Sequence, residues 1–386
     1  MSVPPDLHQQ YLQACQNLSQ PENSFIARVL QEADKSDNMK WTKGITLKIA
    51  GNNHLVPVQR VTDEDLQVLA FVLRSSIFVT GLDLRYNVLT DVGAKHMATF
   101  LQENSTLWYL NLMFNDIGTS GAELIAKALH RNETLVYLRM TGNKIGNQGG
   151  MYFASMLQIN STLEKLDLGD CDLEETTVHV ASMLKNNSSL VELHLCKHEI
   201  KSFGVERLCE ALYENCSLRY LDLSCNRITR DDVKFLGELL KRNQTLEILD
   251  LNSNRIEDDG AVYLSEALAL YNRTLQVLSV VSNNISGKGL VALSQAMKTN
   301  MELSYIYIWG NKFDDATCMA FSELIQTGRL KPACTDVEPY EVDGYVYLAE
   351  LSHGLKKHYY WTPSCGEVTN KAANASLAVG AVLEYL

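Results

Sequence analysis

The sequence predicts an α/β solenoid of about ten stacked units, each about 28 residues long with one short strand and one helix. The first observation is a phrase of the form Asn-x-Ser/Thr/Glu-Leu, whose asparagine recurs about every 28 residues. The asparagines are Asn104, Asn132, Asn160, Asn187, Asn215, Asn243, Asn272 and Asn300. The second observation is a leucine phrase, L-x-x-L-x-L-x-x-N-x-I, that follows each asparagine phrase. A fixed period of this length indicates repeated units that stack on one another.

Each leucine phrase is expected to form one strand. Leucines two residues apart, such as Leu249 and Leu251, lie on the same side of a strand, so that one face of the strand is buried. The phrases "LWYLNLMFNDI", "LVYLRMTGNKI", "LRYLDLSCNRI" and "LEILDLNSNRI" are complete, and variants begin at Leu163, Leu190, Leu275 and Leu303. "VTGLDLRYNVL" precedes the series, and "ITLKIAGNN" is a degenerate first unit.

A helical phrase follows each strand, for example "GAELIAKALHRN" and "GVERLCEALYEN". Apolar residues four apart, such as Ile125 and Leu129, share the helix face that packs on the strand layer. One strand and one helix cannot bury these surfaces alone, so neighbouring units must stack.

From about Ile45 to Gln326 these phrases resemble the leucine-rich repeat family, in its longer intracellular type. The resemblance implies a curved solenoid with parallel strands on the concave face and helices on the convex face. It also implies a ladder of buried asparagine amides that bond to the backbone of each turn. The ladder asparagines are Asn87, Asn115, Asn143, Asn226, Asn254, Asn283 and Asn311. Cys171 and His198 interrupt this ladder in adjacent units.

The Asn-x-Ser/Thr phrase also has the form of an N-glycosylation acceptor. Its place in the repeat explains the asparagine without a sugar, because the residue follows a helix and asparagine tolerates the left-handed conformation that ends one. The Ser or Thr lies in the turn into the strand, where its hydroxyl can bond to backbone. We therefore predict that Asn132 serves folding rather than trafficking.

The two ends of the chain depart from the repeat. We expect a helical cap at residues 1–43, the solenoid at 44–328 and a C-terminal cap at 329–386. In the last part, "EPYEVDGYVYLAEL" alternates around "DG", which predicts a hairpin with a type I′ turn. "LKKHYYW", residues 355–361, is expected to help close that end, and residues 362–386 carry no period.

Composition excludes several classes of protein. The 386 residues carry a net charge of −12, which argues against general binding to the phosphates of nucleic acid. The first 20 residues lack the features of a signal peptide, and no apolar run reaches the length of a membrane span. Nine cysteines without a C-x-x-C pair are typical of reduced thiols inside the cell.

No catalytic or cofactor-binding motif is present, so we expect no enzyme activity, cofactor or metal. "HLCKH", residues 194–198, is the one arrangement with metal-binding residue types. His194 and Cys196 should share one strand face, whereas His198 and Cys171 should point into the turn. Zinc needs about four converging ligands, so a structural role in the ladder is favoured. Acidic pairs at 231–232 and 258–259 should lie at helix starts, where they complement the helix dipole.

The third, fifth and seventh positions of each strand phrase are expected to point outward from the strand layer. Together with the strand edges they form a candidate surface for a partner, with two aromatic patches around an acidic middle. Its residues are Arg85, Trp108, Tyr109, Met113, Tyr137, Arg139, Asp167, Glu192, Tyr220, Asp222, Asp250, Tyr305, Tyr307 and Trp309.

We therefore interpret the chain as a non-enzymatic scaffold that binds a protein on its concave face, with no membrane contact. The whole chain resembles one branch of the repeat family, which implies a place in the nucleus, nucleolus and cytoplasm of germ and stem cells. It also implies nucleophosmin and nucleolin as partners and a part in pluripotency or ribosome biogenesis.

Repeat proteins of this type also build the axoneme of cilia and sperm, including radial spokes, which is the alternative. Resemblance to the Ran GTPase activator suggests a small-GTPase regulator, but residues 362–386 lack that family's acidic tail. Ribonuclease inhibition is disfavoured by the modest cysteine content and the shorter solenoid.

Overall fold

The computed structural model describes residues 6–35, 44–54, 56–173, 176–351 and 379–381. The chain forms two compact units, one of Met1–Asp172 with Tyr360–Leu386 and one of Leu173–Tyr359. The predictions for 355–361 and for most of 362–386 lie outside the described residues. The division into caps and solenoid at residues 43 and 328 stays a prediction. In the part of the chain described, no helix combines the length and apolar character needed to cross a bilayer.

The first unit alternates strands and helices after two N-terminal helices. Its elements are α1 (Leu7–Asn17), α2 (Ser24–Asp34), β1 (Ile45–Lys48), α4 (Asp63–Leu73), β2 (Val79–Asp83), α5 (Asp91–Glu103), β3 (Tyr109–Asn111), α6 (Thr119–Leu129), β4 (Tyr137–Arg139), α7 (Gly146–Leu157), β5 (Lys165–Asp167) and β13 (Val379–Ala381).

The second unit continues the alternation and ends in a hairpin. Its elements are α8 (Thr177–Leu184), β6 (Glu192–His194), α9 (Ser202–Leu212), β7 (Tyr220–Asp222), α10 (Arg230–Arg242), β8 (Ile248–Asp250), α11 (Glu257–Leu270), β9 (Val277–Ser279), α12 (Gly287–Thr299), β10 (Tyr305–Tyr307), α13 (Asp315–Gln326), η1 (Pro332–Cys334), β11 (Val337–Val342) and β12 (Tyr345–Glu350).

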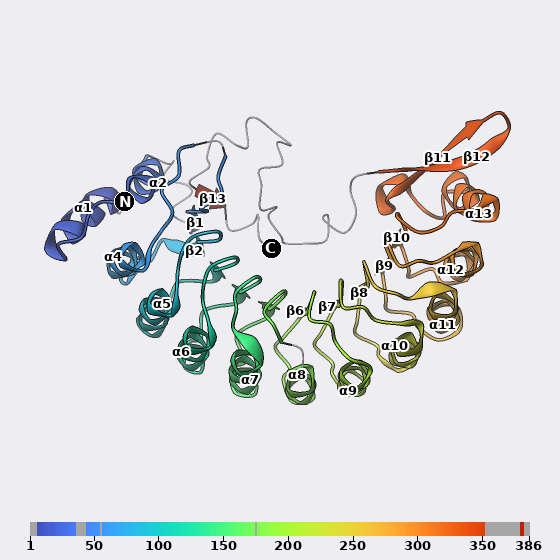
Figure 1. Cartoon of the computed structure of the whole chain (residues 1–386), viewed down its shortest axis with the longest axis horizontal. Helices are drawn as coiled ribbons and strands as arrows, with labels where there is room; N and C mark the ends of the chain where they lie inside the picture. The colour runs from blue at the N-terminus through green and yellow to red at the C-terminus, as the bar shows by residue number, and fades with distance from the viewer. Residues whose placement is uncertain (1–5, 36–43, 55, 174–175, 352–378, 382–386) are drawn as a thin grey trace. The chain divides into compact units, whose positions relative to one another are not determined.

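The repeat strands pair in parallel, which confirms the predicted α/β solenoid. In the first unit Leu82, Leu110, Leu138 and Leu166 stand at equivalent positions of neighbouring strands, and all four are buried. Figure 1 shows that in each unit taken by itself the strands form one layer and the helices the other. The core therefore lies between these two layers, as the leucine spacing requires.

The helices bury the apolar faces that the sequence predicts. Ile125 and Leu129 of α6 are fully buried. Gly121 lets α6 approach α5, since a Cβ at this position would lie 2.8 Å from the Cβ of Ala94. The acidic pairs lie in the first turns of α10 and α11 as predicted, and Asp232 completes a capping box with Thr229.

The asparagine ladder is present in both units. In the second unit, the side chain of Asn254 accepts hydrogen bonds from the backbone N–H groups of Asn226 (3.0 Å) and Ile228 (2.9 Å). Its amide donates to the carbonyls of Leu223 (3.0 Å) and Leu251 (2.9 Å). All of these partners except Leu251 belong to the preceding repeat, so each ladder residue ties neighbouring repeats together.

Cys171 and His198 take ladder positions with other chemistry. In the first unit the thiol of Cys171 donates to the carbonyl of Met140 at 3.3 Å. In the second unit Nδ1 of His198 accepts from the backbone N–H of Leu173 at 3.2 Å. Both side chains thus bond to backbone, which is the structural role that the sequence favours for them.

The Asn-x-Ser/Thr phrase forms a second set of links between repeats. Asn132 is buried, and its amide donates to the carbonyl of Leu101 in the preceding repeat at 2.8 Å. Its side-chain oxygen accepts from the N–H groups of Thr134 (3.0 Å) and Leu135 (2.8 Å). The same three contacts recur at Asn160. The amide nitrogen of a glycosylation acceptor is therefore committed here to the fold.

The predicted left-handed conformation of these asparagines is wrong. Asn104, Asn243 and Asn300 have φ of −89°, −72° and −93° and extended backbone. Left-handed residues instead stand directly before the ladder residues, at Tyr86, Phe114, Gly142, Asp170, Lys197, Cys225, Ser253, Ser282 and Gly310. In some repeats the residue directly after the ladder position is left-handed as well, at Asp172, Glu199, Arg227 and Asn284. The asparagine side chain, rather than a change of backbone hand, satisfies the groups at the helix end.

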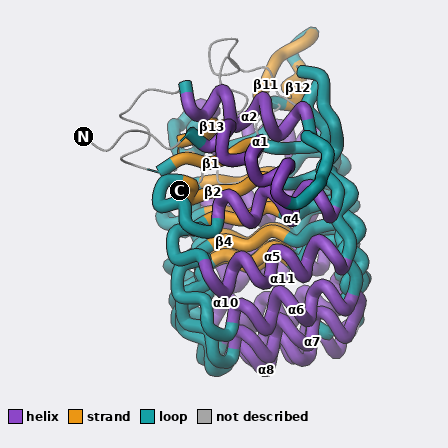
Figure 2. Tube along the Cα trace, turned by 90° about the vertical axis from the view of Figure 1, so that its left-hand side faces the viewer, coloured by secondary structure: helices purple, strands orange, loops and turns teal. Residues whose placement is uncertain are grey.

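The N-terminal cap combines helices and a strand. Helices α1 and α2 form as predicted, with α1 against α4 and α2 against β1. The sequence carries no pattern that predicts β13, which pairs antiparallel with β1 and places Gly380 opposite Thr46. Figure 2 shows β13 beside β1 at the edge of the sheet. An unpaired edge would offer its backbone groups to other chains, and β13 removes that exposure.

The C-terminal hairpin confirms the turn prediction. Strands β11 and β12 are antiparallel, and the two residues between them, Asp343 and Gly344, have φ of 51° and 81°. Two successive positive φ values define the type I′ turn. Leu348 is buried where the hairpin packs on α13.

Candidate partner-binding face

The strand face of each unit is built from two columns of side chains. In the first unit one column contains Gly81, Tyr109, Tyr137 and Lys165, and the other contains Asp83, Asn111, Arg139 and Asp167. In the second unit the columns are Glu192, Tyr220, Ile248, Val277 and Tyr305, and His194, Asp222, Asp250, Ser279 and Tyr307. Parallel register places equivalent residues on neighbouring strands, so members of a column interact.

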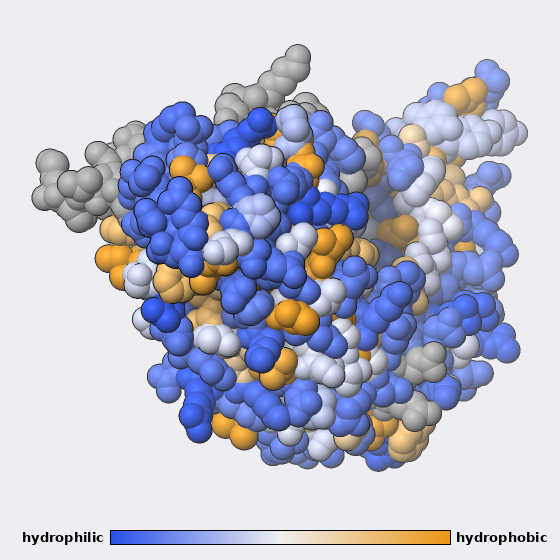
Figure 3. Space-filling model, turned by 60° about the vertical axis from the view of Figure 1, so that its left-hand side comes forward, coloured by the Kyte–Doolittle hydropathy of each residue, from blue (hydrophilic) through white to orange (hydrophobic). Residues whose placement is uncertain are grey.

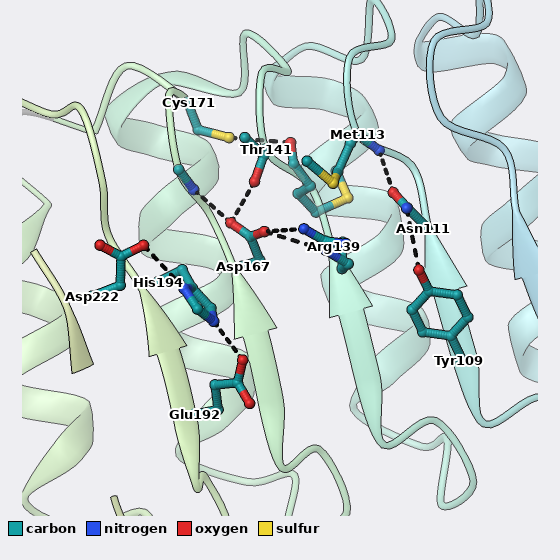
Figure 4. A network of polar contacts seen from close by, with 12 residues as sticks. Tyr109, Asn111, Met113, Arg139, Thr141, Asp167, Cys171, Glu192, His194 and Asp222 are labelled. Atoms are coloured by element: carbon teal, nitrogen blue, oxygen red, sulfur yellow. Dashed lines mark hydrogen bonds and ion pairs between the residues drawn. The ribbon is translucent and has the colours of Figure 1, made fainter. Parts of the chain in front are cut away.

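In the first unit the two columns form an aromatic and ionic cluster (Figure 4). The rings of Tyr109 and Tyr137 lie 5.3 Å apart, and Trp108 packs against them. Arg139 lies over the Tyr137 ring, 5.8 Å from its centre, and bonds to the carboxylate of Asp167 at 3.3 Å. Because a buried charge is unfavourable without a partner, this pairing stabilises both residues.

The carboxylate of Asp167 accepts hydrogen bonds from several donors. The hydroxyl of Thr141 donates to Oδ1 of Asp167, and so does the backbone N–H of Gly169 at 3.1 Å. Nε and Nη2 of Arg139 both contact Oδ2. Each oxygen of this carboxylate therefore accepts from two donors.

In the second unit a histidine lies between two carboxylates. Nε2 of His194 lies 2.6 Å from Glu192, and Nδ1 lies 3.1 Å from Asp222. The ring also meets Tyr220 edge-on at 5.0 Å. Figure 4 shows both carboxylates directed at the two ring nitrogens. An imidazole donates from both nitrogens only when it is protonated, and in that state it offsets one of the two buried negative charges.

Asp250 extends this acidic column on β8. Burial raises the pKa of the Asp250 carboxyl well above its usual range, and Asp222 on the neighbouring strand raises it further. The backbone N–H of Asn252 donates to Asp250 at 2.9 Å and opposes that shift. A carboxyl with a raised pKa binds more protons in the folded than in the unfolded protein.

We expect Asp250→Asn to become progressively more stabilising, relative to wild type, as pH rises. The contribution of Asp250 to stability is largest at low pH and is lost as pH increases from about 4 through the raised pKa. Asparagine removes this titration and keeps an oxygen to accept from Asn252. Urea unfolding of both proteins at about pH 5 and about pH 8, followed by circular dichroism, measures the difference.

The matched control for this experiment is Glu214→Gln, which removes an exposed carboxylate from the same unit. Its difference from wild type should stay the same at the two pH values. A difference for Asp250→Asn that is constant, or that shrinks with rising pH, would contradict the assignment.

The expectation that the predicted surface residues are open to solvent is wrong for most of them. The buried ones are Tyr109, Met113, Tyr137, Arg139, Asp167, Glu192, Tyr220, Asp222, Asp250 and Tyr307. Arg85, Trp108, Tyr305 and Trp309 are partly exposed. Contacts between neighbours in a column, such as Tyr109 with Tyr137, cover surface that a single strand would expose. Whether any of these residues binds a partner stays a prediction.

The residues of "HLCKH" do not converge. His194 bonds to carboxylates on the strand face, whereas His198 bonds to backbone in the turn. In the described part of the chain, no group of three or more His, Cys, Asp or Glu side chains has an arrangement that could hold a metal ion.

Several polar residues that contribute to the strand face are not among those predicted from the sequence. Asn111 donates to the Tyr109 hydroxyl at 3.2 Å, and Lys165 lies over the Tyr137 ring at 5.7 Å. Asn252 accepts from the hydroxyl of Ser279 and from the N–H of Val281. All of these residues stand on or next to the strand phrases, but the phrases do not show which polar side chains bond to one another within a strand or between repeats.

The match to a family of repeat proteins agrees with the architecture. The Leucine Rich repeat family matches residues 75–98, 103–126, 131–154, 160–175, 214–237, 242–265 and 271–294. The matches leave out 176–213, which contains the irregular ladder residue His198. Among solved structures, a yeast Rad7 and Elc1 complex is similar at 14% identity over 81% of this chain and 89% of that chain, with a TM-score of 0.38.

Curated relatives are similar along almost the whole chain. Human leucine-rich repeat-containing protein 34 is 57% identical over 97% of this chain and 87% of its own length. Its mouse counterpart is 54% identical over 98% of this chain and 99% of its own length. At this identity and coverage, the chain belongs to the leucine-rich repeat-containing protein 34 family.

Proposed function

We propose that the chain is a non-enzymatic scaffold that holds a protein partner on its strand face. The observation that carries the proposal is a pair of partly exposed aromatic residues on or next to one strand of the second unit, Tyr305 and Trp309. Tyr305 packs with Ile248 and Val281 on the buried cluster of Val277 and Tyr307. Aromatic residues above a packed apolar base are the usual anchors of protein interfaces.

The base of this patch is rigid. Tyr307 and Val277 are buried beneath it, and the indole of Trp309 meets Phe313 edge-on at 5.8 Å. The backbone N–H of Trp309 donates to the carboxylate of Asp336 at 3.0 Å. A partner would therefore meet anchors already held in place, which lowers the entropy lost on binding.

The first unit offers a comparable but smaller contact. Trp108 is partly exposed over the buried tyrosine pair, and Arg85 is held by Asp83 at 3.3 Å. Arginine beside aromatic residues is a common composition at the centre of an interface. We propose that this cluster supplies a secondary contact to the same partner or to a second one.

We propose nucleophosmin and nucleolin as candidate partners, with a role in pluripotency or ribosome biogenesis in germ or stem cells. The net charge of −12 is suited to basic segments of such proteins. A structural place in an axonemal complex such as a radial spoke is the alternative setting, and regulation of a small GTPase is a weaker one. Cross-linking mass spectrometry on testis or ciliated tissue would distinguish these settings by the proteins joined to the strand face.

We expect the double substitution Tyr305→Ser and Trp309→Ser to weaken binding of purified nucleophosmin by about 30-fold or more. Loss of an anchor residue typically removes about 2 kcal/mol or more of binding free energy. Biolayer interferometry with the full chain immobilised measures the dissociation constant, and circular dichroism checks the fold.

The control removes two other exposed aromatic residues of the second unit, by Phe203→Ser and Tyr271→Ser. It should bind like wild type. Equal affinity of the Tyr305 and Trp309 variant and wild type would rule out the patch as the anchor. Failure of wild type to bind nucleophosmin would instead remove that partner and leave the axonemal setting to be tested by cross-linking.

A further inference from the structure

We propose that the outer face of the β11–β12 hairpin is a separate docking surface for an extended, basic segment of a partner protein. We define this tyrosine face by Tyr340, Val342, Tyr345 and Tyr347. It shares no residue with the strand face, and it can bind a partner whether or not the strand face does.

The register of the hairpin places these four side chains together. Tyr340 stands opposite Tyr347, and Val342 stands opposite Tyr345. Residues two apart on a strand share a face, so all four project from the same side. Their exposed fractions are 49%, 47%, 60% and 43%, and the rings of Tyr340 and Tyr347 stack at 5.6 Å.

The opposite side of the hairpin provides its attachment. Leu348 and Val337 are buried, and β12 packs on α13. The backbone N–H of Leu351 donates to the carbonyl of Asp336 at 2.7 Å, while Asp336 itself accepts from Ile308 and Trp309. Figure 1 shows the hairpin extending past α13. The tyrosines are therefore not what fastens the hairpin to the rest of the unit.

The tyrosine face brings four exposed apolar and aromatic side chains together on one short hairpin. On the face drawn in Figure 3, hydrophilic residues dominate and hydrophobic ones lie in small separate groups. Single exposed apolar residues are normal, whereas a contiguous patch on a protruding element indicates an interaction. Tyrosine suits such a surface, because it contributes contact area and a hydroxyl while having few rotatable bonds.

The charges around the tyrosine face select the partner. Residues 332–351 contain no lysine or arginine. Four exposed acids form the perimeter of the hairpin: Glu338 on the tyrosine face, Asp343 in the turn, and Glu341 and Glu350 on the opposite side of the strands. Within the described residues, none of these four takes part in an ion pair. Such a perimeter repels nucleic acid, anionic lipid and a second copy of the same surface. It attracts arginine and lysine, which also stack favourably on tyrosine rings.

The backbone of the hairpin favours an extended partner. Among the described strands, β11 and β12 pair only with each other, so the outer edge of β11 has no strand beside it. An extended segment can add to such an edge through main-chain hydrogen bonds, while its alternate side chains reach the face. A strand in which arginine alternates with an apolar residue would satisfy both the edge and the acidic perimeter.

The test uses a fluorescein-labelled ten-residue peptide of alternating arginine and valine, with an alternating glutamate and valine peptide as its counterpart. We expect the arginine peptide to bind the full-length chain in fluorescence anisotropy, more weakly as salt increases, and the glutamate peptide not to bind. A tyrosine variant should bind the arginine peptide at least about tenfold more weakly. It combines Tyr340→Ser, Tyr345→Ser and Tyr347→Ser. A glutamine variant should also bind the arginine peptide more weakly, and its affinity should depend less on salt. It combines Glu338→Gln, Glu341→Gln and Glu350→Gln.

The control replaces three equally exposed apolar residues elsewhere in the unit, by Phe203→Ser, Leu270→Ser and Tyr271→Ser. It should bind the arginine peptide like wild type. Equal binding by the tyrosine variant and wild type, or by the two peptides, would overturn the proposal. A dimer in light scattering that disappears in the tyrosine variant would overturn it in favour of a second copy. If the tyrosine variant fails to fold, the glutamine variant alone decides.

Discussion

Asn132→Ala is expected to lower the free energy of unfolding by about 2–5 kcal/mol. The substitution leaves the carbonyl of Leu101 and the N–H groups of Thr134 and Leu135 without their side-chain partner. A buried backbone group without a partner costs about 1–3 kcal/mol, and three such groups are affected here. Because Leu101 belongs to the preceding repeat, the loss also weakens the contact between repeats. Urea unfolding monitored by circular dichroism measures the change.

The matched control is Glu133→Ala, the next residue of the same phrase, which is exposed. This variant should unfold at nearly the urea concentration of wild type. The native protein should show no change in mass after treatment with a glycosidase, since the Asn132 amide nitrogen bonds to Leu101. Equal midpoints for the two variants, or a sugar on Asn132, would show that the asparagine does not serve the fold.

The repeat architecture could be predicted because it depends on short, periodic rules. Leucine spacing determines which strand face is buried, and the asparagine period fixes the length of each repeat. The hairpin was predictable for the same reason, since a type I′ turn requires positive φ at Asp343 and Gly344. The strand β13 was not predictable, because its three residues carry no pattern and their pairing with β1 is a long-range contact.

The left-handed backbone conformation was predicted at the asparagines that follow each helix, and there is a physical reason why this prediction is wrong. Asparagine adopts the left-handed conformation more readily than most residues, so it is the natural candidate wherever a helix ends. In this chain the asparagine keeps an extended backbone, and its side chain hydrogen-bonds to backbone groups instead. Left-handed conformations occur at residues such as Phe114 and Ser253, directly before the ladder residues. Sequence periodicity identifies the turn but does not reveal which of its residues carries the positive φ.

Exposure of the strand face could not be predicted from one repeat at a time. The rule that alternate residues point outward places Tyr137 and Arg139 on the correct face, but it says nothing about the side chains on neighbouring strands. The parallel register brings Tyr109 against Tyr137 and Arg139 against Asp167. The two members of each pair come from successive repeats, so burial at these positions depends on pairing between repeats.

Breaking the buried ion pair of Arg139 and Asp167 should also lower the free energy of unfolding strongly. Arg139→Met is expected to lower the free energy of unfolding at neutral pH by about 3–5 kcal/mol, because it leaves the buried carboxylate of Asp167 without its cation. The same substitution at Lys127, which forms an exposed pair with Glu123, should change stability little. Guanidinium unfolding of the three proteins compares the two effects.

The double variant Arg139→Met with Asp167→Asn separates the charge from the packing. Asparagine is neutral at this position, and its oxygen can still accept from Thr141 and Gly169, which bond to Asp167 in the wild type. If the uncompensated charge causes the loss, the double variant should recover stability to within about 1–2 kcal/mol of wild type. If it stays as unstable as Arg139→Met alone, the contribution of Arg139 comes mainly from its contact with the Tyr137 ring. The strand face of the first unit would then be held together by aromatic packing rather than by ion pairing.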